Sequence, residues 1–171
     1  MAEIKSTLDL VMERTRHLSM SDEEKSLQQR EDFEKRLQGL LQQYLDQTLT
    51  VKGLRDRLAA LQAELKVSDE QYVLQEVLGR IDPDKGHARW LELVAEMAPG
   101  VYGRLQKILA EYAEHLADLL LAGEERELTR LAESCDIRGA AVVPNPLKDP
   151  EYARAVADRR SATLAGIDAL K

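Results

Sequence analysis

The chain has few of the residues that build cross-linked or catalytic sites. Its 171 residues include one cysteine, three histidines, five prolines and nine glycines. The single cysteine, Cys135, excludes an intramolecular disulfide and favours a reducing, cytoplasmic location. The sequence contains no phosphate-binding loop, no dinucleotide-binding glycine pattern, no nucleophile elbow and no zinc-protease motif. These scarcities favour a non-enzymatic protein over an enzyme, and no cofactor is expected.

Positive charge and long apolar runs are also scarce. The formal net charge is -7, whereas non-specific nucleic-acid binding needs clustered lysine and arginine. The densest basic segment holds Arg154, Arg159 and Arg160 and is interrupted by Asp158, so it is only a weak candidate for contact with nucleic-acid proteins. The densest apolar stretch, residues 116–122, is too short to span a bilayer. We therefore expect neither nucleic-acid binding nor membrane insertion.

A heptad repeat of apolar residues dominates what the sequence does contain. Such spacing places side chains on one seam of an α-helix and predicts packing against other helices. It favours one long helix over 22–65, about 65 Å long at 1.5 Å per residue. A turn near Thr48–Thr50, with Thr50 as an N-cap, is the alternative and would give a more compact hairpin. The two rows are Leu37, Tyr44, Val51, Leu58 and Leu65, and Phe33, Leu40, Gln47, Leu54 and Leu61.

Local signals divide the rest of the chain into helices. Ser21 and Glu24 form a capping box that predicts a helix start. Pro99 predicts a break between two helices, and Gly123 fits the position just after a helix end. The spacing of Cys135 from Leu128 and Leu131 predicts a small core residue. The sequence thus predicts an all-α helical bundle with a long, coiled-coil-like central helix.

The character of the chain changes after residue 138. Residues 139–146 cannot form a regular helix and predict an extended, proline-containing connector. Pro150 then fits the first position of a further helix. We predict a helical bundle domain over 1–138, followed at 139–171 by the connector and either a docked helix or a mobile tail.

The composition and the seam favour a cytoplasmic interaction protein, such as an adaptor, assembly factor or structural subunit. Its partner would be a second copy, with a homodimer as the expected form, or another protein. The second apolar row of the long helix stops before Leu54, so the residues expected to meet another chain are Leu54, Leu58, Leu61 and Leu65. Trp90 is a further candidate, because tryptophan is frequent at interface hot spots, although a core position is favoured.

Two Glu/His pairs support an alternative function as a helical metalloprotein or enzyme. Glu13 and His17 are four residues apart, as are Glu111 and His115, so each pair lies on one helix face. Helical di-iron sites use a spacing of three residues, which both pairs lack. The sequence therefore favours structural or surface histidines over metal ligands.

Overall fold

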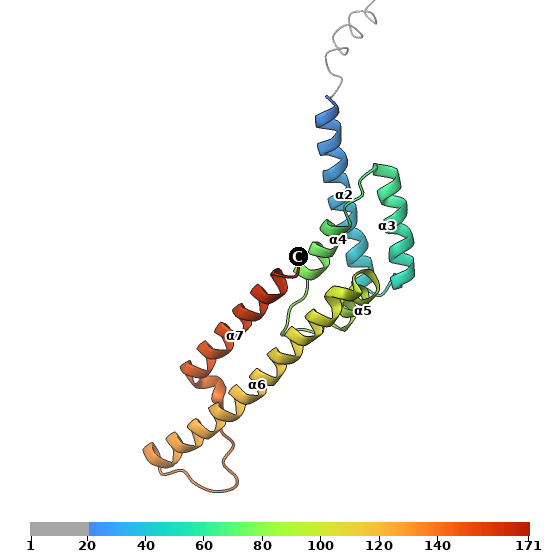
Figure 1. The fold of residues 1–171 in the computed structure, drawn as a ribbon. Coiled ribbons are helices and arrows are strands. Elements are labelled where there is room, and N and C mark those ends of the chain that lie inside the picture. The colour runs from blue at the N-terminus through green and yellow to red at the C-terminus, as the bar shows by residue number, and fades with distance from the viewer. Residues whose placement is uncertain (1–20) are drawn as a thin grey trace, which may run out of the picture. The chain divides into compact units, whose positions relative to one another are not determined.

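The computed structural model describes residues 21–171, which form helices joined by turns and by a longer loop at 135–145 (Figure 1). This range contains no β-strand, which confirms the all-α class. The elements are α2 (Asp22–Leu45), α3 (Val51–Leu65), α4 (Glu70–Gly79), α5 (Ala88–Met97), α6 (Pro99–Ser134), the short 3₁₀ helix η2 (Pro146–Lys148) and α7 (Pro150–Asp168).

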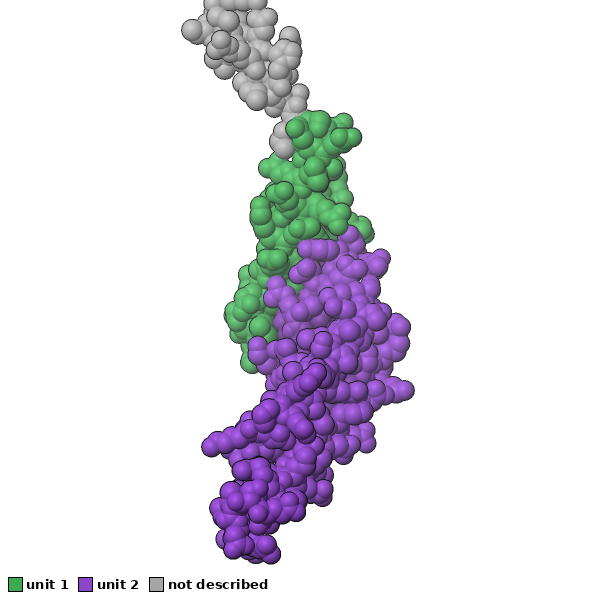
Figure 2. Space-filling view, turned by 90° about the vertical axis from the view of Figure 1, so that its left-hand side faces the viewer, with its two compact units in different colours: residues 1–68 green, residues 69–171 purple. Residues whose placement is uncertain are grey.

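The chain divides into two compact units, which Figure 2 shows in separate colours. The first ends at Ser68 and the second spans Asp69–Lys171. This division lies inside the domain predicted over 1–138. The predicted boundary at 138/139 separates the helical bundle domain from a segment, 139–171, that could detach from it. This boundary stays a prediction.

The first unit contains a helical hairpin in which α2 and α3 pack against each other. Arg36 Nη1 donates to Glu64 Oε1 at 2.8 Å, and Arg57 Nη1 donates to Gln43 Oε1 at 2.9 Å. The later residue of α2 thus pairs with the earlier residue of α3, so the two helices run antiparallel. Their buried apolar side chains are Phe33, Leu37, Leu41, Tyr44, Leu54 and Leu61.

The predicted start of α2 is confirmed by its cap. The Glu24 backbone N–H donates to Ser21 Oγ at 3.1 Å, and the Ser21 backbone N–H donates to Glu24 Oε2 at 2.7 Å. Each terminal donor thus finds an acceptor that the helix itself cannot supply. Three acidic residues in the first turn add a favourable interaction with the helix dipole.

The favoured prediction of one helix over 22–65 is wrong, because the chain turns between Leu45 and Val51. Gln47 adopts a left-handed backbone with φ of 62°, and it lies exposed in the turn. Thr50 caps α3 by accepting from the Gly53 backbone N–H at 3.1 Å. Heptad spacing continues through the turn because both arms of a hairpin bury an apolar face. The pattern therefore cannot distinguish a hairpin from a rod.

The long central helix is instead α6 in the second unit. It contains 36 residues and is about 54 Å long at 1.5 Å per residue. Pro99 occupies its first turn, where a missing N–H costs nothing, so the break predicted there is confirmed. Both α5 and α7 pack against α6, and α4 packs against α5 and α7.

The helix end predicted at Gly123 is wrong, since α6 continues to Ser134. Gly123 is buried, and a Cβ atom added there would lie 2.8 Å from Pro146 Cβ and 3.2 Å from Tyr152 Cδ2. The segment that leads into α7 thus passes too close to α6 for any side chain at this position. Close packing, rather than helix termination, accounts for the glycine.

The C-terminal segment is a docked helix. Asp149 caps α7 by accepting from the Glu151 backbone N–H at 2.9 Å, and Pro150 follows as predicted. Arg126 on α6 also pairs with Asp149, with Nη2 and Oδ2 3.2 Å apart. Nearer its other end, α7 brings Gly166 close to the Ile108 side chain. The two helices therefore lie side by side along much of α7 (Figure 1).

Candidate functional site

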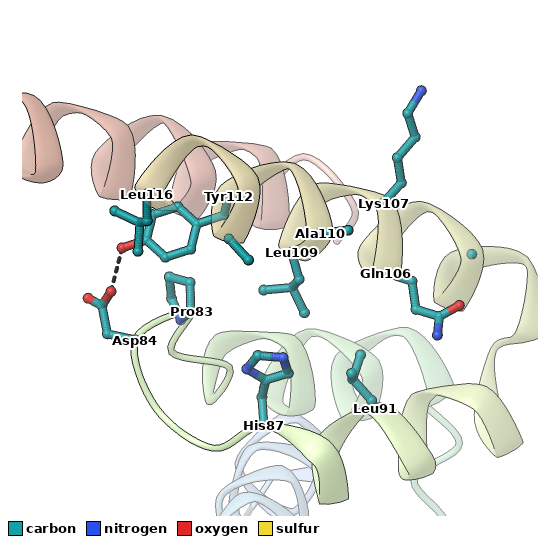
Figure 3. A pocket seen from close by; sticks show the side chains of 12 residues that line it. Pro83, Asp84, His87, Leu91, Gln106, Lys107, Leu109, Ala110, Tyr112 and Leu116 are labelled. Carbon is teal, nitrogen blue, oxygen red and sulfur yellow. Dashed lines mark hydrogen bonds between the residues drawn. The ribbon is translucent and has the colours of Figure 1, made fainter. Parts of the chain in front are cut away.

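A groove of about 850 Å³ lies between α5 and α6 in the second unit. Figure 3 shows Leu109 pointing from α6 toward α5, and His87 and Leu91 pointing toward α6. Lys107 extends away from the groove (Figure 3). The apolar part of the lining consists of Pro83, Leu91, Leu109, Ala110, Ala113 and Leu116. An apolar wall with polar groups at its edge is suited to binding an amphipathic ligand.

A polar cluster closes one end of the groove. Tyr112 on α6 donates from its hydroxyl to Asp84 Oδ1 (Figure 3). Arg160 on α7 donates from Nε to Asp84 Oδ2 at 2.6 Å and from Nη2 to Asp82 Oδ1 at 3.2 Å. Lys85 Nζ lies 3.4 Å from Asp82 Oδ2. These contacts attach the turn before α5 to both α6 and α7.

Hydrogen bonds and burial shift the pKa of three groups of this cluster, Asp82, Arg160 and Tyr112. The Asp84 backbone N–H lowers the pKa of Asp82; partial burial opposes this effect, and Arg160 and Lys85 lower the pKa further. The hydrogen bonds to Asp82 and Asp84 raise the pKa of Arg160. Burial, followed by the hydrogen bond to Asp84, raises the pKa of Tyr112 to about 12. Opposite charges and donors are matched, which is typical of a structural contact.

A row of exposed leucines continues from the groove along α6. Leu120, Leu121 and Leu128 are 40%, 60% and 41% exposed. Leu120 is four residues from Leu116 and seven from Ala113, so it shares their side of α6. Leu121 and Leu128 are seven residues apart and lie about 60–80° from Ala113, on the side of it away from Leu116. We call this surface, formed by Leu91, Ala113, Leu116, Leu120, Leu121 and Leu128, the α6 face.

Helix α7 covers a different side of α6. Its residues approach Ile108, His115, Gly123 and Arg126. All four positions lie more than a quarter turn away from Leu121 and Leu128 at 100° per residue, while Gly123 lies about 60° from Leu120. Leu121 and Leu128 are therefore left uncovered by the helix that packs along α6, and Leu120 borders the covered side.

Acidic side chains flank the row, and Glu124 lies within it, four residues from both Leu120 and Leu128. Glu114, Asp118, Glu124 and Glu125 each lie three, four or seven positions from Leu121. Within residues 21–171 none of these four carboxylates has an ion-pair partner, whereas Arg126 and Arg130 nearby are paired with Asp149 and Glu127. The α6 face and its edges thus carry uncompensated negative charge.

The structure gives the residues of one predicted Glu/His pair other contacts. His115 Nδ1 lies 2.6 Å from the Glu111 carbonyl oxygen and 3.0 Å from Arg159 Nη2, so one tautomer donates to the first and the other accepts from the second. The Glu111 carboxylate faces Lys107, with Oε1 and Nζ 3.8 Å apart. Glu13 and His17 lie outside the described residues. Over 21–171, no group of three or more His, Cys, Asp or Glu side chains could hold a metal ion.

The predicted interaction residues have mixed exposure. Leu54 and Leu61 are buried, while Leu58 and Leu65 are half-buried. Trp90 is buried, and the Arg80 guanidinium carbon lies 6.0 Å from its ring centroid. Their role in meeting another chain stays a prediction.

Cys135 is exposed and forms no disulfide, so the predicted core position is wrong. It follows the last residue of α6, beyond the part that α7 covers. The regular spacing of Cys135 from Leu128 and Leu131 indicated a shared helix face, but no other element covers that face at Cys135.

Sequence reasoning missed both the polar cluster and the leucine row. The row had one visible signal: Leu119, Leu120 and Leu121 are consecutive, and three consecutive residues cannot all face one neighbouring helix. The polar cluster gave no such signal in the sequence, because Asp84 and Arg160 are 76 positions apart.

Comparisons with protein-family models, with curated proteins and with solved structures found no significant match to this chain. Across residues 21–171, no helix has both the length and the apolar character that crossing a bilayer requires.

Proposed function

We propose that this protein is a non-enzymatic helical interaction protein that binds another protein through the α6 face. The observation that carries the proposal is the row of Leu120, Leu121 and Leu128, exposed on one side of a helix and continuous with an apolar groove. Single exposed leucines are ordinary, whereas apolar residues gathered on one surface are typical of binding sites.

The energetics of the row support binding. Fully burying a leucine side chain contributes about 1.5–3 kcal/mol, and these three are 40–60% exposed, so covering them contributes about 2–5 kcal/mol in total. Association costs about 4–15 kcal/mol through lost rotational and translational freedom and ordered side chains, so further contacts are needed. The groove adds apolar contacts beyond the leucines, at Leu91, Ala113 and Leu116. Together they support an interface of moderate affinity.

We place this activity in the cytoplasm and keep self-association as part of the proposal. Cys135 is an exposed free thiol, and such thiols persist in reducing compartments. Self-association would use Leu58 and Leu65, the half-buried members of the predicted seam. A surface on α3 and the α6 face can therefore be tested independently.

A site-specific photo-crosslinker tests the α6 face. It replaces Leu121 in one sample and Leu27 in another; Leu27 is the matched control, because it is an equally exposed helical leucine at 62% outside this surface. After illumination in lysate of the native source, we expect one defined cross-linked protein from position 121 and not from position 27. Adding Leu128→Glu to the position-121 sample should abolish that product.

The thermal unfolding midpoint of each variant shows that the fold is intact. Identical products from positions 121 and 27, or a product that persists with Leu128→Glu, would contradict the proposed function. Absence of any product from position 121 would contradict it as well.

A further inference from the structure

We infer that the α6 face binds a basic amphipathic helix of another protein. This inference rests on the proposed function and names the chemistry of the partner. Its two parts are that the partner is helical and that lysine or arginine flanks its apolar side. Shape supports the first part and charge supports the second.

The shape of the α6 face is that of a strip. It extends along α6 from Ala113 to Leu128, about 22 Å or four helical turns. The backbone groups of α6 within this strip are hydrogen-bonded inside the helix, so an extended peptide cannot add to it by strand pairing. Recognition must use side chains spaced at three, four and seven residues. A second helix laid along the groove presents its apolar side chains with the same period.

The charge around the strip determines which helix fits. Glu114, Asp118, Glu124 and Glu125 flank Leu121, and none is neutralised by an ion pair within residues 21–171. A partner that covers Leu121 brings its own flanking positions close to these carboxylates. Lysine or arginine there gains favourable pairing and faster encounter, while glutamate there is repelled.

The same charge argues against a second copy as the occupant. Two α6 faces placed together would oppose two sets of unpaired carboxylates. Arg126 and Arg130, which could compensate, are already paired with Asp149 and Glu127. The apolar strip is therefore better matched by a basic partner.

Peptide binding to the full chain tests this inference. The probe is a designed helix of about four turns with leucine on one face and lysine at the flanking positions. The comparison peptides carry glutamate in place of lysine, or the same lysine-containing composition in scrambled order. Fluorescence anisotropy gives each dissociation constant at low and at physiological salt. We expect the lysine helix to bind about tenfold or more tightly than either comparison peptide, as several favourable charge pairs would produce.

Two sets of variants locate the binding. Leu121→Glu with Leu128→Glu should abolish binding of the lysine helix, and Leu27→Glu should leave it unchanged. Glu114→Gln with Asp118→Asn should weaken it by a few fold, whereas Asp56→Asn, which removes an exposed carboxylate from α3, should not. Thermal unfolding midpoints check that each variant is folded.

Four results would overturn the inference. They are no binding of the lysine helix, equal binding of the glutamate helix, equal binding of the scrambled peptide, or a dimer of the full chain that Leu121→Glu with Leu128→Glu converts to a monomer. If the position-121 cross-link persists while the lysine helix fails, the proposed function survives and only the basic partner is wrong. If the cross-link also fails, the proposed function is wrong.

Discussion

Arg160 on α7 donates from Nε to the Asp84 carboxylate at 2.6 Å, which ties the turn before α5 to a helix 76 positions later in the chain. Replacing Arg160 with alanine should loosen this turn. Both side chains are about half exposed, so the thermal unfolding midpoint should fall only slightly, and less in high salt. The sensitive measurement is hydrogen exchange of the Asp84 backbone N–H, which donates to Asp82 and should exchange faster in the variant.

Arg154→Ala provides the control, because Arg154 is an exposed arginine on the same helix and has no ion pair among the described contacts. Unchanged exchange at Asp84 in Arg160→Ala would show that the turn is held by its other contacts alone.

Tyr112→Phe should alter the alkaline limit of stability. Burial and the bond to Asp84 raise the pKa of Tyr112 to about 12, while an unfolded tyrosine ionises near pH 10. Tyr112 therefore keeps its hydroxyl proton to higher pH in the folded state than in the unfolded state. The stability that this difference contributes is complete below about pH 10 and is lost as the pH rises toward 12. Phenylalanine has no such proton. The unfolding free energy should decline less steeply with pH in the variant than in the wild type.

Urea denaturation at several pH values between about 9 and 11.5 measures this difference in slope. At neutral pH the variant should be less stable by about 1 kcal/mol, the usual contribution of one hydrogen bond. Parallel curves for the two proteins across the alkaline range would show that Tyr112 ionises normally.

Gly123→Ala should destabilise the second unit by about 1–3 kcal/mol, as overpacking does. The new methyl would lie 2.8 Å from Pro146 Cβ, and the proline ring has little freedom to move away. Gly103→Ala is the matched control in the same helix, because it is exposed and a Cβ there meets nothing within 4 Å. It should instead stabilise by up to about 1 kcal/mol through helix propensity. Equal effects of the two substitutions on chemical denaturation would refute the close approach.

The local features of the fold were predictable from sequence. The cap at Ser21, the break at Pro99 and the start at Pro150 depend on residues within a few positions of each other, and each is present. Proline geometry and side-chain capping act on the backbone directly, whatever packs nearby.

Features that depend on distant residues were not predictable. The heptads of α2 and α3 satisfy a hairpin as well as a rod, so they did not choose between the two, and only the local N-cap signal at Thr50 indicated the turn. The sequence predicted a helix end at Gly123, because the residue that makes glycine necessary there, Pro146, lies 23 positions later and gives no local signal. The α6 face likewise depends on which side of α6 is covered by α7, and apolar periodicity does not encode that choice.

Purified protein should contain no stoichiometric transition metal. The His115 ring faces the Glu111 carbonyl and Arg159, and the Glu111 carboxylate faces Lys107. Elemental analysis after purification without chelator measures the content, and His17→Ala with His115→Ala tests both predicted pairs together. One equivalent of zinc or iron in the wild type that the double variant loses would establish the metalloprotein alternative instead.

Leu58→Asp and Leu61→Asp should separate self-association from folding. Leu58 is half-buried on α3, whereas Leu61 is buried, so only the first substitution can leave the hairpin intact. If the row from Leu54 to Leu65 meets a second chain, Leu58→Asp should convert a dimer to a folded monomer in sedimentation velocity. Leu61→Asp should lower stability whatever the oligomeric state, by at least the 2–5 kcal/mol typical of losing a core leucine. A wild-type monomer, or a Leu58→Asp protein that still dimerises, would assign this row entirely to the packing of a single chain.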